Sequence, residues 1–479
     1  MQTLLFHKEI NLASHSAEDR SQQTFNRQLL LFASKPTESP SPDSSIHLQQ
    51  GLSKRERLKA LLESKLDFHG EDSSYASHNL HSFAAKFPPQ LPRVFIRGLT
   101  SPGDIVLDPM MGSGTTLVEA LLEGRQGIGI DFDPLALRLG QAKTRTVNLN
   151  NIQDITNKVL QKARHDLSGG DKIDLSLSDF FDEKTKTFIN YWFLPRTQRE
   201  LMALALAIQG VAHEPTRRFF ELTLSSIIVT KSGGVSMARD LAHSRPHLDK
   251  AKIPKNALEQ FLFRLKKNLK SVGRLEAGGG VASIIAGDAR LMPITDGVID
   301  LIVTSPPYAN AIDYMRAHKF SLVWLGNSIS DLSKLRAGYI GSERIGCEVS
   351  DDLPDRPQRI SYELQQRDQK KGAILQKYFF EMKAMLSEAF RVLRDDSAAI
   401  VVVGTSKMRD MDTQTHLCLA DIGATMGFDV VGVTRRAMDR NKRMMPARFG
   451  KKNGSPIEDR MHEEYVIGLF KPRSQFIST

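Results

Sequence analysis

Short apolar runs alternate with amphipathic segments in two stretches of the chain. In the first stretch, each apolar run is typical of a buried strand and each amphipathic segment of a helix. Such alternation predicts right-handed βαβ units and a parallel sheet. The expected elements are a helix at 93–99, a strand at 104–107, a helix at 113–123, a strand at 127–130 and a helix ending near residue 144.

The alternation then stops and resumes only near residue 280. Residues 150–275 are mostly helical in pattern, and we interpret them as an insertion in an α/β domain. Beyond the insertion, the pattern predicts strands at 282–286, 300–303, 398–403, 429–433 and 464–469, and helices at 311–325, 378–393 and 415–426. An antiparallel hairpin of the last two strands would complete a mostly parallel, seven-stranded sheet.

The chain therefore divides into four parts. They are an N-terminal extension (1–74), the first part of the α/β domain (75–149), a helical insertion (150–278) and the second part of the α/β domain (279–475). The extension contains a Ser- and Pro-rich linker at 34–43 and a segment at 53–66 with the spacing of a surface helix. A polar, irregular stretch at 327–370 is too long for an ordinary connection.

Composition disfavours a membrane protein, a disulfide-rich protein and a metal-binding protein. The chain has 479 residues, of which 41% are hydrophobic, and no stretch reaches the roughly 18 apolar residues of a membrane span. Cys347 and Cys418 lie far apart, which disfavours a disulfide framework and fits a cytoplasmic location. The 13 histidines show no metal-ligand spacing, so no metal is expected. A formal charge of +10 suits a polyanionic partner.

A Gly-rich turn follows the first expected strand, where residues 108–116 read DPMMGSGTT. Gly112 and Gly114 allow a sharp turn and the close approach of a ligand. The helix that follows offers unpaired N–H groups to a carboxylate. No Lys follows Gly114, which disfavours a nucleoside triphosphatase.

Acidic residues follow the next two strands of this sheet. Asp131 ends the second strand and is placed to accept hydrogen bonds from ribose hydroxyls. Asp288, after the third strand, can accept from an adenine amino group, and Phe132 can pack against adenine or belong to the core. Together with the turn, these side chains predict a site for a nucleoside-bearing cofactor.

A second motif, TSPPY at 304–308, ends the fourth strand. The lone pair of an exocyclic amine is delocalised into its ring, so acceptors that hold both N–H groups are needed to aim it at a methyl donor. Ser305 Oγ and the Pro306 carbonyl are such acceptors, and neither Pro306 nor Pro307 carries a competing N–H. Tyr308 supplies a flat face for a flipped base. The motif predicts catalysis largely by positioning.

The two motifs resemble those of the DNA amino-methyltransferases that act on N4 of cytosine or N6 of adenine. The turn is similar to that family's cofactor motif, with Met110 in place of the usual Phe, and Ser305–Tyr308 matches its Ser-Pro-Pro-Tyr variant. The resemblance implies a Rossmann-like, class I fold dependent on S-adenosylmethionine (SAM). It also extends to 81–92, the segment that closes over the methionine end of the cofactor. The cofactor-binding residues that it implies are Lys86, Phe87, Asp108, Met110, Gly112, Gly114, Thr115, Asp131, Phe132 and Asp288.

The resemblance leaves several substrates open. Ser305 favours N4 of cytosine in DNA, whereas adenine enzymes more often carry Asp or Asn at this position. Many cytosine enzymes have the Pro-Pro motif before the cofactor loop, but here it comes second, an order shared with tRNA guanine-N2 methyltransferases. The alternatives are therefore N6-adenine methylation, RNA amino-methylation, or a SAM-fold subunit that binds nucleic acid without catalysis.

Two basic windows are candidate phosphate contacts for double-stranded DNA. Residues 196–275 contain 15 Lys or Arg and 6 Asp or Glu, and residues 435–452 contain 8 basic residues and 1 acidic residue. The polar stretch 327–370, next to the catalytic motif, is the candidate target-recognition loop. One chain carries no information on an accompanying restriction endonuclease.

Overall fold

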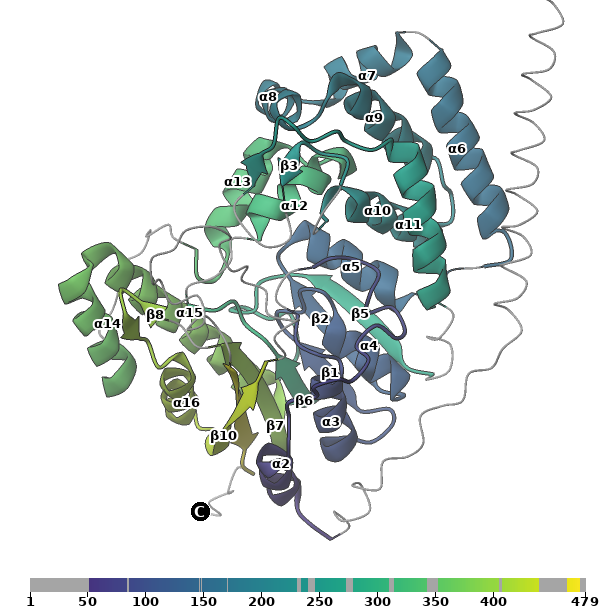
Figure 1. The fold of residues 1–479 in the computed structure, drawn as a ribbon. Helices are drawn as coiled ribbons and strands as arrows, with labels where there is room; N and C mark the ends of the chain where they lie inside the picture. The colour runs from purple at the N-terminus through teal and green to yellow at the C-terminus, as the bar shows by residue number, and fades with distance from the viewer. Residues whose placement is uncertain are drawn as a thin grey trace, which may run out of the picture. The chain divides into compact units, whose positions relative to one another are not determined.

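The computed structural model describes residues 51–473 apart from 84–85, 146, 148, 170, 231–233, 240–245, 273–278, 310–313, 343–351, 405–406 and 439–462 (Figure 1). The Ser- and Pro-rich linker at 34–43 and the part of the second basic window from residue 439 onward lie outside the described residues. Residues 51–479 cluster as one compact unit.

A seven-stranded sheet forms the centre of this unit (Figure 1). In spatial order its strands are β5 (Val281–Ala286), β2 (Gln126–Asp131), β1 (Ile105–Asp108), β6 (Ile299–Thr304), β7 (Leu393–Gly404), β11 (Glu463–Lys471) and β10 (Asp429–Ala437). All neighbouring strands are parallel except that β11 runs antiparallel to both β7 and β10. The predicted α/β fold class, with its mostly parallel sheet and final hairpin, is confirmed.

The central strands are buried on both faces, which explains their continuous apolar runs. Every residue of β6 is buried. Alternate side chains enter two different cores: Val106 and Leu301 pack with the helices on one face, and Leu107 and Ile302 with those on the other. Because β1 and β6 are parallel and in register, their carboxyl ends meet at one edge of the sheet.

Helices cover both faces of the sheet. The helices of the α/β part are α2 (Lys54–Glu63), α3 (Gln90–Leu99), α4 (Thr115–Leu122), α5 (Pro134–Thr144), α15 (Gln369–Val392) and α16 (Thr415–Thr425). Ser53 and Glu56 form a capping box that starts α2. Leu58 and Leu62 of α2 are buried in the core that α3 shares with β7 and β11. The structure thus places α2, expected within a peripheral extension, against the sheet.

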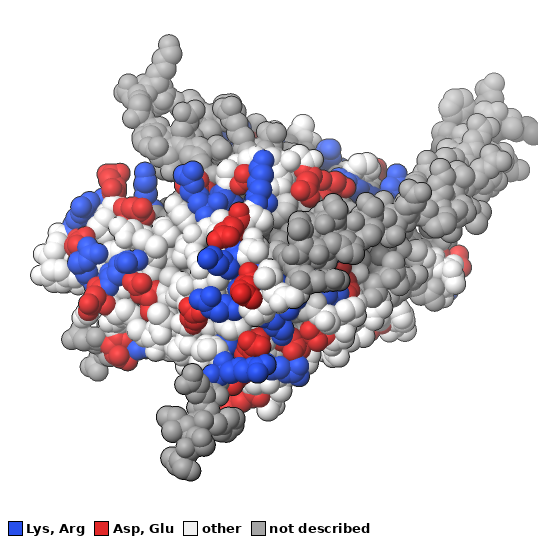
Figure 2. Space-filling view, turned by 90° about the horizontal axis from the view of Figure 1, so that it is seen from below, with Lys and Arg blue, Asp and Glu red and all other residues white. Residues whose placement is uncertain are grey.

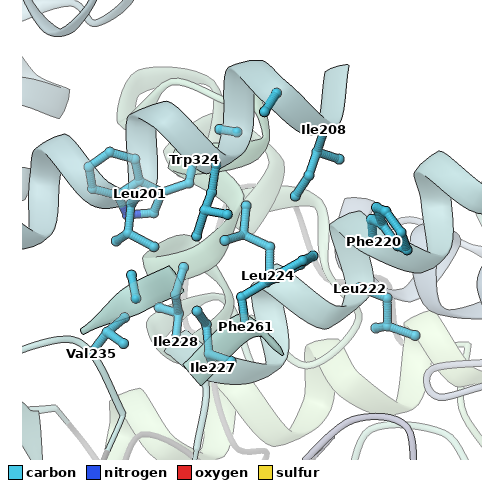
Figure 3. Close-up of a cluster of buried hydrophobic side chains, with 14 of the residues drawn as sticks. Leu201, Ile208, Phe220, Leu222, Leu224, Ile227, Ile228, Val235, Phe261 and Trp324 are labelled. Carbon is cyan, nitrogen blue, oxygen red and sulfur yellow. The ribbon is translucent and has the colours of Figure 1, made fainter. Parts of the chain in front are cut away.

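The insertion forms a second, largely helical layer whose core also includes side chains of α5 from the α/β part. It comprises α6 (Ile152–Ser168), α7 (Lys172–Phe180), α8 (Glu183–Trp192), α9 (Pro195–Gln209), α10 (Glu214–Ile228), α11 (Ala257–Val272) and the short strands β3 (Ala238–Arg239) and β4 (His247–Leu248). Phe220, Leu224 and Phe261 fill its centre (Figure 3). Trp324, from the segment after the catalytic motif, enters the same core (Figure 3). This motif is therefore attached to the insertion through its own downstream helix.

That downstream segment contains more helix than expected. It begins with α12 (Met315–Leu322) and the 3-10 turn η3 (Val323–Leu325). The prediction of an irregular stretch at 327–370 is wrong, because α13 (Ile329–Gly338) and α14 (Asp355–Arg367) lie within it. The helix α14 is strongly polar but buries Pro357, Ile360 and Leu364, which share one helical face.

The sequence predicted neither a membrane span nor a metal site, and the structure bears on both only for the described residues. None of the helices there combines the length and apolarity needed to cross a membrane. Within the same part of the chain, no group of His, Cys, Asp and Glu side chains is arranged to hold a metal ion. Cys418 is a buried free thiol.

Candidate active site

The two sequence motifs meet at the carboxyl edge of the sheet. Asp108 ends β1 and Thr304 ends β6, and Thr304 Oγ1 donates a hydrogen bond of 2.7 Å to Asp108 Oδ1. The same carboxylate oxygen accepts from the Met110 amide at 3.2 Å. Asp108 is 2% exposed, and its burial raises its pKa to about 6. Asp108, expected to bind cofactor, therefore links the Gly-rich turn to the TSPPY motif.

The turn after β1 depends on its glycines. Gly112 has φ +46° and Gly114 has φ +72°, a region that other residues avoid. A Cβ on Gly112 would also lie 3.3 Å from Cε1 of Phe83. Gly114 is the N-cap of α4, so the free N–H groups of this helix start at Thr115, whose hydroxyl lies 3.0 Å from Ser113 Oγ.

Asp131, at the end of β2, holds this turn in place. Its Oδ2 accepts from the Gly112 amide and its Oδ1 from the Asp133 amide, both at 2.8 Å. Burial and the neighbouring Asp133 carboxylate raise the pKa of Asp131 to about 7. Asp133 itself bonds to His318 Nδ1 at 2.7 Å. An ionised carboxylate has about four acceptor sites, so Asp131 keeps capacity for two further donors.

Asp288 and Phe132 lie farther along the same edge. Both carboxylate oxygens of Asp288 accept from Arg290, at 2.9 Å and 2.6 Å, and this pairing lowers the pKa of Asp288 against the opposing effect of burial. Phe132 is 37% exposed and contacts Tyr339 edge-on, with ring centroids 5.8 Å apart. A half-exposed aromatic face beside Asp131 is available to a ligand.

Two residues of the segment before α3 were expected to bind the cofactor, and their side chains lie in different surroundings. Lys86 Nζ donates to the His78 carbonyl at 2.7 Å. Phe87, expected to bind the cofactor, is buried in the core beneath α3. Met110 is partly buried against the core on the α15 face.

An aromatic cluster that the sequence reasoning missed lies over the turn. Phe83 stacks on Tyr314 with ring centroids 5.7 Å apart and lies 5.0 Å from the His318 ring. Burial and the carboxylates of Asp131 and Asp133 raise the pKa of Tyr314, so this ring lies close to them. Phe83 belongs to segment 81–92, to which the family resemblance extends. That resemblance was the one signal in the sequence that could have pointed to this aromatic cluster.

The second motif turns off the end of β6. Pro306 is buried, whereas Ser305 and Pro307 are partly exposed. Tyr308 donates its hydroxyl to Glu464 Oε1 at 2.9 Å. Burial and this carboxylate hold the pKa of Tyr308 well above its usual range, with the Ser305 hydroxyl acting in the opposite direction. Tyr308 therefore stays neutral, with Ser305 beside it.

Among the described residues of the basic windows, several arginines pair with acidic side chains of the protein itself. In the insertion, Arg218 pairs with Glu214 and Glu221, at 3.2 Å and 2.9 Å. In the second window, Arg436 is 4% exposed and pairs with Glu464. Figure 2 shows the molecule from below relative to Figure 1, and on this face Lys and Arg are interspersed with Asp and Glu. Among the described residues on that face, no patch of one sign is visible.

The strand order and the turn after β1 together define the class of protein. With β6 at the centre, β1, β2 and β5 on one side and an antiparallel hairpin at the far edge, the sheet has the arrangement of a Rossmann-like, class I SAM-dependent methyltransferase.

Comparisons with known proteins show which proteins this chain is similar to. A family model for N6- and N4-type methyltransferases, described as DNA methylase, matches residues 7–142. The Type II methyltransferase M.MvaI of Kocuria varians is 24% identical over 74% of this chain and 83% of its own length. M.BsoBI of Geobacillus stearothermophilus, another Type II methyltransferase, is 25% identical, and the match covers 58% of each chain.

A solved SAM-dependent methyltransferase from Methanosarcina mazei aligns with 79% of this chain and 97% of its own. Its sequence is 10% identical to that of this chain, and the TM-score is 0.30. By sequence, the chain is similar to the DNA amino-methyltransferases, the family that its two motifs resemble, and SAM is the cofactor of that family.

Proposed function

We propose that the protein is a site-specific DNA methyltransferase that transfers a methyl group from SAM to the exocyclic N4 amine of cytosine. The observation that carries this proposal is the 2.7 Å hydrogen bond between Thr304 and Asp108. It joins a cofactor-type turn to an amine-binding motif at one edge of the sheet. A donor and an acceptor held there would be neighbours, as a direct transfer requires.

The residues on the cofactor side fit SAM chemically. Asp131 has free acceptor capacity for the two ribose hydroxyls, and the first turn of α4 offers N–H groups to the methionine carboxylate. Phe132 presents an exposed face for adenine, and Phe83 closes over Gly112. When bound, SAM would supply an electrophilic methyl group.

The residues on the base side fit an exocyclic amine. Ser305 Oγ and the Pro306 carbonyl would accept the two N–H groups, which directs the nitrogen lone pair away from the ring and toward the methyl group. Tyr308 would stack on a base that has been flipped out of the duplex. No strong general base is needed before attack, and the neutral Tyr308 supplies none.

Three observations favour cytosine in DNA over the alternatives. Ser305 occupies the position where adenine enzymes more often carry Asp or Asn. The similar proteins M.MvaI and M.BsoBI are Type II methyltransferases, and the matching family model is described as DNA methylase. The complete Ser-Pro-Pro-Tyr motif argues against a subunit without catalysis. N6-adenine methylation is the second candidate, because Ser305 indicates a preference and the family includes both activities.

The test is to incubate the purified protein with labelled SAM and either DNA or tRNA, and to identify the modified nucleoside by mass spectrometry. We expect N4-methylcytosine. Methylated tRNA with unmodified DNA would contradict the proposal, and N6-methyladenine would replace it by the second candidate.

The catalytic motif is tested by Ser305→Ala. We expect kcat to fall by about a hundredfold, as when a preorganised hydrogen-bonding group is removed from an active site. Ser168→Ala is the matched control, because Ser168 is an exposed serine at the end of α6 that donates to the His165 carbonyl of its own helix. Full activity of Ser305→Ala would refute the assigned role.

A further inference from the structure

A row of three residues crosses the antiparallel edge of the sheet beneath Tyr308. Gly404 of β7 is directly opposite Glu464 of β11, and Glu464 is directly opposite Arg436 of β10. Directly opposite residues of antiparallel strands project to the same face. The row therefore forms a continuous support next to the catalytic motif.

Each member of the row contacts the next or the tyrosine itself. Tyr308 lies over Gly404, where a Cβ would be only 2.7 Å from Cε2 of the ring. The Tyr308 hydroxyl reaches Glu464 Oε1 at 2.9 Å, and Glu464 Oε2 accepts from Arg436 Nη1 at 2.5 Å. Arg436 Nε is anchored in turn on the Leu66 carbonyl at 3.1 Å.

The burial of this ion pair calls for an explanation. Glu464 is 5% exposed and Arg436 is 4% exposed. Removing both charges from water costs about as much as their attraction returns, so an apolar pair would stabilise the hairpin equally well. Farther along β11, Val466 and Ile467 are such apolar residues. The charged pair lies instead where it can hold the tyrosine hydroxyl.

We propose that Gly404, Glu464 and Arg436 are positioning residues that fix the Tyr308 ring in the orientation in which it stacks on the target base. Gly404 leaves room for the ring, Glu464 fixes its hydroxyl, and Arg436 fixes and neutralises Glu464. This inference rests on the proposed function, because it assumes that Tyr308 receives a base. It assigns to the β10–β11 hairpin a part in base binding that acts through Tyr308.

A double-mutant cycle separates this role from a merely structural one. Glu464→Gln keeps the side-chain shape but removes the charge, and Tyr308→Phe keeps the ring but removes the hydroxyl. We expect each to lower kcat/KM for DNA by about tenfold, the loss typical of a hydrogen bond to a charged group. The double variant should be no worse than about tenfold, because both changes break one interaction. The KM for SAM should not change.

Glu200→Gln is the matched control for the cycle. Glu200 is also buried, at 4% exposed, but it bonds to Asn256 and the Ala257 amide within the insertion. Its effect should multiply with that of Tyr308→Phe. Wild-type kcat/KM for Glu464→Gln, or a loss of about a hundredfold in the double variant, would overturn the proposal.

A second variant leaves the ion pair intact, in case Glu464→Gln does not fold. Gly404→Ala is expected to displace the ring and lower kcat/KM for DNA by about tenfold. Gly432→Ala in β10 is its control, because a Cβ there would meet only Leu62 at 3.4 Å, an ordinary contact. Equal activity of the two variants would overturn the proposal.

The outcome can be separated from a failure of the proposed function. Wild-type protein without activity on DNA would refute the proposed function directly. The coupling between Tyr308 and Glu464 would then still be measurable as non-additive changes in urea unfolding of the same four proteins. Additive unfolding changes would refute the row itself.

Discussion

The insertion is held together by apolar packing, whereas the active-site edge of the sheet contains buried carboxylates. In the insertion, Phe220, Leu224 and Phe261 pack together in an apolar core (Figure 3). At the edge, carboxylates such as Asp108 and Asp131 are removed from water and held by hydroxyl and backbone N–H groups. Apolar packing does not depend on pH, whereas a desolvated carboxylate changes its charge near neutrality. The difference predicts that the stability of the apolar core and the binding of cofactor at the edge can be perturbed separately.

The largest effect should come from the apolar side of this comparison. Phe261→Ala removes a fully buried ring that contacts Phe220 edge-on, and it should lower the free energy of unfolding by about 3–5 kcal/mol. Phe263→Ala, on the same helix but 67% exposed, is the control and should cost less than about 0.5 kcal/mol. Urea unfolding measures both. SAM affinity should not change, and a loss of affinity would show that the two regions are not separable.

A smaller effect should follow from a change to the backbone of the turn. Gly112→Ala places a Cβ at φ +46° and 3.3 Å from Phe83, so we expect SAM binding to weaken by roughly 1–2 kcal/mol. Gly297→Ala has a similar φ of +63° but no atom within 4 Å of the added Cβ. Calorimetric titration with SAM should distinguish the two. Unchanged affinity for Gly112→Ala would show that cofactor does not bind at this turn.

The sequence predicted those features that depend on interactions between residues close together in the chain. The seven strands follow from apolar runs, and the two motifs follow from turns within a few residues. The helix α14 was missed because its buried face consists of only a few residues in a strongly polar segment. The helix α13 buries only Leu332, so its pattern gave even less signal.

The contacts that support the site could not be predicted in the same way. Tyr308 and Glu464 are 156 positions apart, and nothing near either residue indicates the other. Phe83 meets Tyr314 only after the sheet has brought the two segments together. Arg436 looked like a phosphate contact because charge in sequence does not reveal burial. Local patterns thus identify reacting groups, while the residues that orient them depend on tertiary structure.

The smallest predicted effect tests whether Asp131 couples cofactor binding to pH. Its native pKa of about 7 is raised above the usual 3.8, so between these values the folded protein holds a proton that the unfolded chain has lost. Asp131 therefore favours folding less as pH rises through this window. Ribose hydroxyls donate to the ionised form, so SAM affinity should rise by about tenfold from pH 6 to pH 8 and level off above the pKa.

Asp131→Asn should abolish this dependence, binding SAM more weakly than wild type at pH 8 and nearly as well at pH 6. Calorimetry in buffers of different ionisation enthalpy should also detect proton release when wild-type protein binds SAM near pH 6.5, but not with Asp131→Asn. If the variant kept the wild-type pH profile, the titrating group would be another buried carboxylate. Asp108, with a pKa of about 6, would then be the candidate. That result would shift the pH-sensitive element from the cofactor side to the junction between the two motifs.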